Sequence, residues 1–576
     1  MKNTVKLFVI VVMLLAALVL VAQAPLPSVP RPYTPVTQKM LENPSPDDWL
    51  MFSRTYDAQR YSPLKQINKQ NVGQLKMVFT LDMPTGSTET IPLVHDGVMY
   101  ATMPSGAVRA LDAATGDTVW EYKRPGNGGR SKTLGIFQDL ILYAAPDSYV
   151  VGIDARTGEM RWQSKVETRG NSSGPLVADG KVISGGSCGG NRNNCFISAH
   201  DALTGKELWR FYTTPAPGEP GDETWGGADV KNRQASTWGL PGTYDVERKM
   251  LYWGVANPMP DQRLTRHDGN VDAVSRTAPA DLYSNSTIAL NPETGKLAWY
   301  YQHLPGDDWD SDFTHERTLV RTRVSPDPRY VKWINPDVRP GQEHDVVIAI
   351  GEAGGIFVLD RNDGKFLWAT PFPADAPEFV ISDIDVKTGK TSINWNNVFK
   401  KSGESHVICF WNTRSYWPTA YSPVTNSLYT SYIDNCRDFT LGGRGGQLNI
   451  IPRPGSNPNE LTGLAKIDLT TGKILRFDVG RAPGNGAMLA TAGGLIFHGD
   501  LSQKFKAFDA ETGKELWQTT LVGNISVSTI TYAVKGKQYV AVMTGDNPKV
   551  PELAREVPEL NTPKHNAIYV FALPGK

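Results

Sequence analysis

Short apolar stretches alternate with polar residues along most of the chain, and tight-turn residues separate them. Segments 92–100, 175–183 and 490–497 each hold an alternating run, an Asp-Gly or Gly-Gly turn and a second run. This order predicts a strand, a turn and a second strand. No segment shows a strong helical period, so we expect an all-β protein.

A ten-residue repeat, apolar residue then Asp-Ala-x-Thr-Gly-x-x-x-Trp, is the strongest signal in the sequence. Clear copies lie at 111–120, 153–162, 200–209 and 508–517, and weaker copies at 290–299, 359–368 and 467–476. The pattern predicts a hairpin in which the Asp carboxylate caps the turn and Gly takes positive φ. The Trp four residues after Gly is then expected to face a neighbouring sheet.

The spacing of these repeats predicts how the chain is divided. Successive Asp positions lie 42 and 47 residues apart near the N-terminus and 41 apart near the C-terminus, which is the span of a four-stranded propeller blade. Wider gaps must hold long loops or a degenerate blade near 421–429. One β-propeller with Trp-docking repeats is therefore favoured over the four or so domains that 576 residues would otherwise suggest.

The first 24 residues read as a secretory signal peptide, with a basic start, an apolar run from Leu7 to Ala22 and an Ala-Gln-Ala end. The alternative is an uncleaved membrane anchor, but the run is short for a span of about 20 residues. We expect cleavage after Ala24, an N-terminal extension over 25–46, and an exported protein with no stable membrane insertion.

The charge balance and the cysteine residues exclude further classes of function. The chain has 59 Lys and Arg against 59 Asp and Glu, so no net field favours nucleic acid. None of its four cysteines lies in a Cys-x-x-Cys-His motif, so we expect no c-type haem on this chain. Their spacing favours two local disulfides over a zinc site.

Several motifs together resemble the quinoprotein alcohol dehydrogenases: the Trp repeat, the opening segment 48–68, and segments 237–239 and 251–258. This family consists of eight-bladed β-propellers that use pyrroloquinoline quinone (PQQ). The resemblance runs from about Asp47 to the C-terminus and implies a propeller over 47–576. It also implies oxidation of an alcohol in the periplasm, with electrons passed to a separate cytochrome c or quinone.

The resemblance also assigns residues to PQQ, a flat tricarboxylated quinone that needs an aromatic face and donors for its carboxylates. Trp238 matches the stacking floor of the ring, although it could instead be another docking Trp. Glu89 matches an acid at the quinone edge. Lys132 and Ser172 fall near a family Arg and a family Thr that contact the cofactor, with plain loop residues as the alternative.

Segment 306–313 places four carboxylates within six residues, which requires a hard cation or solvent to offset their repulsion. Asp310 matches the family's catalytic base, and Asn257 matches an oxygen ligand of the metal. Asp312 matches an additional acid of the lanthanide-using branch. The alternative is a solvated acidic loop.

Four features depart from the family pattern. The metal-binding Glu expected before Asp201 is missing, leaving only the neutral side chains of Asn191, Asn193 or Asn194. Glu352 stands where a Lys or Arg is usual, and Ser415 where an Asn often contacts the cofactor. The family's adjacent-cysteine pair is absent from 123–130. Counting Asp310, Asp312 and one PQQ carboxylate, the charge favours Ca²⁺ over a lanthanide.

The cysteine pairs follow from the same comparison. Cys409 and Cys436 correspond in position to a disulfide of the methanol-oxidising relatives, and Cys188 with Cys195 is expected to form a second pair across a Gly- and Asn-rich loop.

The sequence thus predicts a PQQ-dependent dehydrogenase that oxidises a primary or secondary alcohol, with polyols and sugars among the candidate substrates. The alternative, from a different class, is a non-catalytic exported propeller that serves as a binding scaffold. Retention of Glu89, Trp238, Asn257 and Asp310 together favours the enzyme.

Overall fold

The computed structural model describes residues 32–124, 131–442, 447–526, 528–546 and 550–575. The chain divides into two units, Met1–Tyr33 and Thr34–Lys576, and every strand of the described residues lies in the second. The predicted signal peptide at 1–24 lies outside the described residues, and the division into extension and propeller stays a prediction. No helix in the described ranges is long and apolar enough to cross a membrane.

Eight sheets of four or five strands make up most of the described chain. In order of their position along the chain they are β3 (Leu93–His95), β4 (Val98–Thr102), β5 (Val108–Asp112) and β6 (Thr118–Tyr122); β7 (Gly135–Phe137), β8 (Leu140–Ala145), β9 (Tyr149–Asp154) and β10 (Met160–Lys165); β11 (Asn171–Ala178), β12 (Lys181–Gly186), β13 (Phe196–Asp201) and β14 (Glu207–Tyr212); β16 (Thr243–Asp245), β17 (Met250–Gly254), β19 (Ser286–Leu290) and β20 (Leu297–Gln302); β21 (Thr318–Val324), β23 (Gln342–Gly351), β24 (Gly354–Asp360), β25 (Phe366–Thr370) and β22 (Trp333–Ile334); β29 (Ala420–Ser422), β30 (Ser427–Ile433), β33 (Thr462–Asp468) and β34 (Ile474–Gly480); β1 (Tyr61–Ser62), β35 (Leu489–Thr491), β36 (Leu495–Gly499), β37 (Lys504–Asp509) and β38 (Glu515–Thr520); and β39 (Ile530–Val534), β40 (Lys537–Thr544), β41 (Ala567–Ala572) and β2 (Lys76–Asp82).

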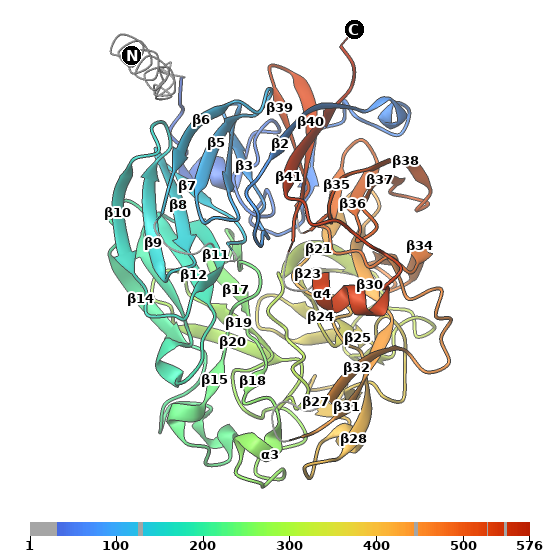
Figure 1. The fold of residues 1–576 in the computed structure, drawn as a ribbon. Coiled ribbons are helices and arrows are strands. Elements are labelled where there is room, and N and C mark those ends of the chain that lie inside the picture. The colour runs from blue at the N-terminus through green and yellow to red at the C-terminus, as the bar shows by residue number, and fades with distance from the viewer. Residues whose placement is uncertain (1–31, 125–130, 443–446, 527, 547–549, 576) are drawn as a thin grey trace, which may run out of the picture. The chain divides into compact units, whose positions relative to one another are not determined.

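The sheets follow one another in chain order through the unit Thr34–Lys576, from blue to red in Figure 1. The last of them combines both ends of the chain, because β2 pairs antiparallel with β41. The strand β1 likewise joins β35, in parallel. The all-β prediction is therefore confirmed, whereas the count of eight blades stays a prediction. The suspected degenerate segment 421–429 forms the hairpin of β29 and β30.

The repeat forms the predicted turn. The Asp112 carboxylate accepts hydrogen bonds from the backbone N–H groups of Ala114 and Thr115 at 2.8 and 3.0 Å, and Gly116 has φ +82°. The copy at Asp201 repeats these contacts. The Asp thus satisfies turn donors while Gly takes the left-handed conformation, as the sequence predicts.

The aromatic ring of one repeat packs on the turn glycine of the next. The Trp120 indole donates to the Ala155 carbonyl oxygen at 3.0 Å, and a Cβ added at Gly158 would lie 2.7 Å from the Trp120 ring. The pattern continues with Trp162 on Gly205, Trp209 on Gly295, Trp299 on Gly364 and Phe477 on Gly513. In the copy at 467–476, which lacks Trp, the neighbouring Phe477 supplies the ring. The predicted docking of Trp on a neighbouring sheet is confirmed.

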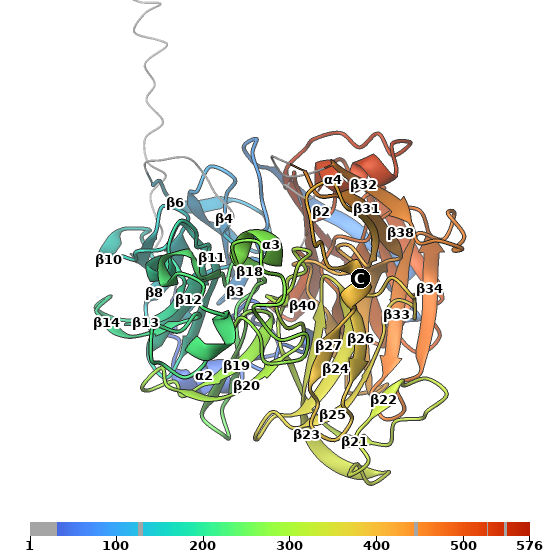
Figure 2. The same ribbon diagram turned by 90° about the horizontal axis from the view of Figure 1, so that it is seen from below.

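Three smaller sheets and three short helices lie outside this repeating structure. The sheets are β15 (Gln234–Ala235) with β18 (Pro258–Met259), β26 (Ile381–Ile384) with β27 (Thr391–Ile393), and β28 (Ser405–Cys409) with β31 (Asn435–Thr440) and β32 (Gln447–Pro452). The helices are α2 (Gln38–Glu42), α3 (Arg263–Arg266) and α4 (Val550–Glu556). Figure 2 shows α3 beside β18. The pair of β15 and β18 lies next in sequence to Trp238 and Asn257.

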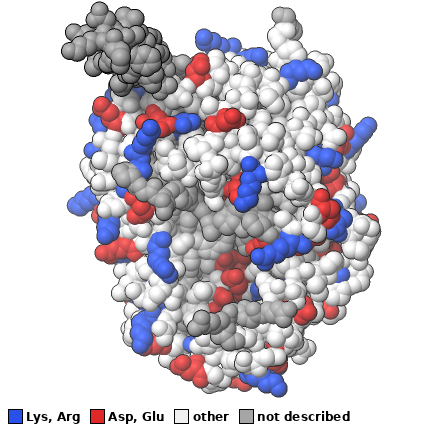
Figure 3. Space-filling model, in the orientation of Figure 1, with Lys and Arg blue, Asp and Glu red and all other residues white. Residues whose placement is uncertain are grey.

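Charged side chains of both signs are mixed over the face shown in Figure 3, without a large patch of one sign. This distribution agrees with the zero formal net charge.

We predict that protein stability falls as the pH rises, because of Glu556 in α4. Burial raises the pKa of Glu556 to about 8, and its Oε2 has no hydrogen-bond partner among the described residues. Since the folded pKa exceeds the unfolded value, the stabilisation is complete below about pH 4.5 and is lost as the pH rises to about 8. Denaturant titrations should show a loss of roughly 1 to 4 kcal/mol across this range.

Glu556→Gln should flatten this dependence, whereas the exposed Glu515→Gln should leave it as in the wild type. An unchanged slope in Glu556→Gln would contradict the assignment.

Candidate active site

Trp238 lies between the two halves of the candidate site. It follows β15, and Asn257 precedes β18, so the antiparallel pairing of Ala235 with Pro258 brings the two segments together. The Trp238 side chain is half-buried, and its Nε1 donates to Asp312 Oδ2 at 2.6 Å. The predicted ring platform is therefore bonded directly to the acidic loop.

Glu89 and Lys132 form a buried ion pair next to the same ring. Both side chains are fully buried, and a parallel bridge between Ile91 and Thr133 aligns their segments. The Lys132 ammonium lies 3.9 Å from the centroid of the Tyr416 ring and 5.7 Å from that of Trp238. The structure thus brings Glu89, Lys132 and Trp238 together, and their role in binding PQQ stays a prediction.

Tyr416 is a residue of this site that the sequence analysis does not identify. Its ring centroid lies 5.9 Å from that of Trp238, with the planes nearly perpendicular at 80°. The one feature of the sequence that points to Tyr416 is its position next to Ser415, which departs from the family pattern. Ser172 shows no such contact: in the described chain its hydroxyl lies 3.4 Å from that of Ser187.

Asp307 and Asp308 hold the acidic loop in shape. Both are fully buried. Asp307 accepts from the backbone N–H groups of Trp309 and Ser311 at 2.7 and 2.8 Å, and Asp308 accepts from that of Phe399 at 2.9 Å. Burial raises the pKa of Asp308 to about 7. The alternative of a solvated acidic loop is therefore wrong, because these carboxyl groups are buried and bonded to backbone donors.

Asp310 and Asp312 differ from these two. Asp310 is half-buried and has φ +56°, an uncommon conformation for a residue other than Gly. Asp312 is 4% exposed, and its Oδ1 accepts from the Asn257 backbone N–H at 2.8 Å. Burial, then the charges of Glu352 and Asp310, raise the pKa of Asp312 well above its ordinary value. A cation at this position would relieve that repulsion.

The donors available to a cation are oxygen atoms. The Asn257 Nδ2 donates to Asp261 Oδ1 at 2.8 Å, which leaves the amide oxygen of Asn257 for another partner. Within the described ranges no three His, Cys, Asp or Glu side chains are grouped to hold a metal ion. The predicted set of Asp310, Asp312 and Asn257 has two carboxylates and one amide, so it suits a hard ion such as Ca²⁺ or a lanthanide rather than Zn²⁺.

Glu352 and Ser415, two residues that depart from the family pattern, contact each other. Glu352 is 2% exposed, and its Oε1 accepts from the Ser415 hydroxyl at 2.6 Å. Its backbone N–H donates to the Asp312 carbonyl oxygen at 2.9 Å. The reversed charge at 352 and the Ser at 415 therefore form a hydrogen-bonded pair beside Asp312.

The structure pairs the cysteines as predicted. Cys409 and Cys436, on β28 and β31, have Cα atoms 4.3 Å apart, and Cys188 and Cys195 have Cα atoms 4.9 Å apart. In the second loop the side chain of Asn194 exchanges two hydrogen bonds of 3.0 Å with Gly189.

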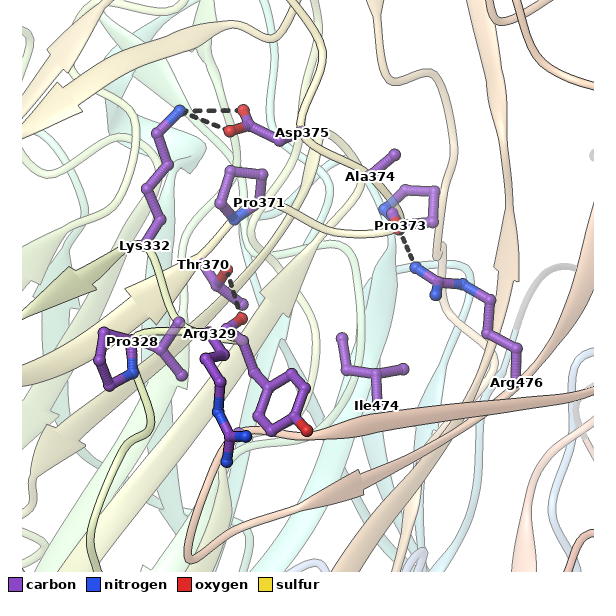
Figure 4. Close-up of a pocket in the computed structure, with 13 residues that line it drawn as sticks. Pro328, Arg329, Lys332, Thr370, Pro371, Pro373, Ala374, Asp375, Ile474 and Arg476 are labelled. Atoms are coloured by element: carbon purple, nitrogen blue, oxygen red, sulfur yellow. Dashed lines mark hydrogen bonds and ion pairs between the residues drawn. The ribbon is translucent and has the colours of Figure 1, made fainter.

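A surface groove of about 450 Å³ lies away from this site, between the segments around β22, β25 and β34 (Figure 4). Its charged groups already have partners, because Lys332 pairs with Asp375 at 2.9 Å and Arg476 donates to the Pro373 carbonyl oxygen. We assign it no ligand.

Known protein families and relatives resemble this chain over most of its length. The chain matches the family described as PQQ glucose, ethanol and alcohol dehydrogenases, β-propeller domain, over residues 49–135, 163–376 and 462–540. It is 30% identical to quinohemoprotein alcohol dehydrogenase ADH-IIG of Pseudomonas putida over 87% of this chain and 72% of that protein. It is 27% identical to quinoprotein alcohol dehydrogenase PedH of P. putida over 93% of each.

Solved structures give the same result. The ADH-IIG structure superposes with a TM-score of 0.80 at 25% identity, covering 95% of this chain and 83% of that one. A europium-containing methanol dehydrogenase superposes with a TM-score of 0.79 at 25% identity, covering 93% of this chain and all of that one. The fold and site thus define a quinone-dependent β-propeller oxidoreductase. The chain belongs to the PQQ-dependent alcohol dehydrogenase family.

We predict that Lys132→Met destabilises the protein by about 3 to 5 kcal/mol, because it leaves the Glu89 charge buried without its ammonium partner. Glu89→Gln combined with Lys132→Met should recover much of the loss. Denaturant unfolding of both single variants and the double variant measures the coupling. Additive effects would show that the pair does not act as a unit.

Proposed function

We propose that this protein oxidises an alcohol to an aldehyde or ketone with PQQ as its cofactor. The observation that carries the proposal is the hydrogen bond from Trp238 to Asp312, because it joins a ring platform to a carboxylate cluster. A propeller that served only as a scaffold would not require this arrangement. We also propose that the eight sheets are the eight blades of one propeller.

The residues present fit the cofactor. Trp238 offers an aromatic face, and Lys132 offers a buried ammonium for an anionic or quinone oxygen. Glu89 accepts from a donor at the edge of the ring. Ser172 stays a proposed contact on sequence grounds alone. When bound, PQQ supplies the two-electron oxidant.

The chain's own chemistry is proton transfer and charge placement. Asp310 accepts the proton of the substrate hydroxyl at a carboxylate oxygen. Asp310, Asp312 and Asn257 would hold a cation, which when bound would supply Lewis-acid polarisation of the reacting oxygens. The buried hydrogen bonds of Asp307 and Asp308 fix the loop, so the base is held in place.

The proposal also includes the location of the protein, its substrate and its electron acceptor. The N-terminal sequence and the disulfides support export to the periplasm. The substrate is an alcohol, with polyols and sugars included. The electron acceptor is a separate cytochrome c or quinone, as the family resemblance implies.

Asp310→Asn should lower kcat by at least about 10²-fold, because the amide keeps the shape of the side chain but does not accept the proton. The assay is dye reduction by protein reconstituted with PQQ and cation, with PQQ content measured in parallel. Asp438→Asn, on β31, is the control and should retain normal turnover. Normal turnover in Asp310→Asn would show that Asp310 is not the catalytic base.

The cation is expected to be trivalent. The negative charge counted from the sequence favours Ca²⁺. That count leaves out Glu352, which lies beside Asp312, and Asp261, which is hydrogen-bonded to Asn257. Added negative charge favours a lanthanide. Protein stripped of cation and supplied with PQQ should regain at least as much activity with La³⁺ as with Ca²⁺, and Glu352→Gln should shift the preference toward Ca²⁺. Activity with Ca²⁺ alone would contradict this.

A further inference from the structure

The predicted cation ligands come from two segments that are far apart in the chain. Asn257 precedes β18, whereas Asp310 and Asp312 belong to the acidic loop. The Asn257 backbone N–H donates to Asp312 Oδ1 at 2.8 Å, which joins the two segments at one point. This backbone contact does not fix the rotation of the Asn257 amide, because the last torsion of an Asn side chain has a broad range.

Asp261 sets the direction of the Asn257 amide. The Asn257 Nδ2 donates to Asp261 Oδ1 at 2.8 Å. An ionised carboxylate only accepts hydrogen bonds, so this contact selects the rotamer in which the amide nitrogen, and not the oxygen, faces Asp261. The amide oxygen is the atom that a hard cation binds. The Asp261 side chain therefore decides whether Asn257 can present its oxygen as a ligand.

Arg266, the last residue of α3, ties Asp261 to the acidic loop. Its side chain is buried. Nη1 donates to the carbonyl oxygens of Pro260 and Asp261 at 2.5 and 2.6 Å, and Nη2 donates to that of Asp307 at 3.1 Å. Figure 2 shows α3 beside β18, the strand that follows Asn257. One guanidinium thus bridges the backbones of both segments.

The Asp307 end of this bridge leads directly to the proposed base. The Asp307 carboxylate accepts from the backbone N–H groups of Trp309 and Ser311, the residues on either side of Asp310. The backbone that carries Asp310 is therefore fixed to Asp307, whose carbonyl oxygen is bound by Arg266.

Asp281 keeps the guanidinium in place. Its side chain is fully buried, and its Oδ2 accepts from Arg266 Nε at 3.0 Å and lies 2.9 Å from Nη2. A planar guanidinium carries five N–H donors in a fixed fork, so it can bind a carboxylate and several carbonyl oxygens at once. A Lys at this position would keep the charge but not this geometry.

We propose that Arg266 and Asp261 are positioning residues, which hold the Asn257 amide in a fixed position relative to the acidic loop and thereby set the affinity of the site for its cation. This inference rests on the proposed function. Arg266 acts through Asp261 and Asp307 rather than by contact with the cation. Groups that orient a metal ligand commonly change metal affinity by about 10- to 100-fold.

Equilibrium dialysis of stripped protein against La³⁺, with PQQ in all chambers and bound metal counted by elemental mass spectrometry, measures this affinity without an activity assay. Arg266→Lys should bind La³⁺ about 10- to 100-fold more weakly than the wild type while it keeps the near-UV circular dichroism of the folded protein. A folded Arg266→Lys with wild-type affinity would overturn the proposal.

Arg233→Lys is the matched control. Arg233 is also buried, and it donates to Asp222 at 2.6 Å and to the carbonyl oxygens of Ala228 and Pro215 at 3.0 and 3.3 Å. Because these partners lie outside the two segments, Arg233→Lys should keep the wild-type affinity for La³⁺. An equal loss of affinity in both Lys variants would show a general effect of replacing a buried Arg and would overturn the positioning role.

Two variants of Asp261 separate orientation from charge. Asp261→Asn and Asp261→Ala both remove the negative charge, but only Asn retains an oxygen that accepts from Asn257 Nδ2. Asp261→Ala should therefore bind La³⁺ at least about fivefold more weakly than Asp261→Asn. Equal affinities would mean that Asp261 acts through its charge alone, which would contradict its positioning role.

Dye reduction by the same proteins separates this inference from the proposed function. La³⁺ binding that depends on Arg266, in a protein that reduces no dye with any alcohol, would support the positioning role and reject the dehydrogenase. Alcohol oxidation together with La³⁺ affinity that is unchanged in Arg266→Lys would support the dehydrogenase and reject the inference. A wild type that binds neither La³⁺ nor Ca²⁺ would reject both.

Discussion

The contact between an aromatic ring and the turn glycine of the next repeat is the constraint on which the rest of this structure depends. At Gly158, Gly205 and Gly295 an added Cβ would lie 2.4 to 2.7 Å from the preceding Trp ring, and each glycine has positive φ. Glycine is therefore required both by conformation and by space. Because each of these rings belongs to one sheet and its glycine to the following one, the contact sets the position of these sheets relative to their neighbours.

The segments that connect the docked strands carry the residues of the candidate site. Trp238 lies outside the repeat, so its ring packs near Lys132 and Tyr416 and its Nε1 bonds to Asp312. In the acidic loop the carboxyl groups of Asp307 and Asp308 accept from backbone N–H groups, and that of Asp312 accepts from the Asn257 N–H and the Trp238 indole. The buried charges of the site are thus supported by elements that the docked sheets hold in place.

The sequence predicts the repeating part of the fold well and the site in part. A period of about 41 to 47 residues marks the hairpins directly, because turn chemistry is local. The family resemblance marked Glu89, Lys132 and Trp238 as cofactor-binding residues, and the structure places the three side chains together. Tyr416 is marked in the sequence only by its position next to Ser415, since its partners Trp238 and Lys132 come from segments far apart in the chain. The pairing of Glu352 with Ser415 likewise explains two departures that the sequence presents separately.

We propose that Trp238, Lys132 and the acidic loop form one PQQ site. The most direct measurement is an equilibrium titration of stripped protein with PQQ and cation, followed by visible absorption and by quenching of tryptophan fluorescence. We predict one PQQ bound per chain and binding at least about tenfold weaker in Trp238→Ala. No PQQ binding by the wild type, or equal affinity in Trp238→Ala, would contradict the account.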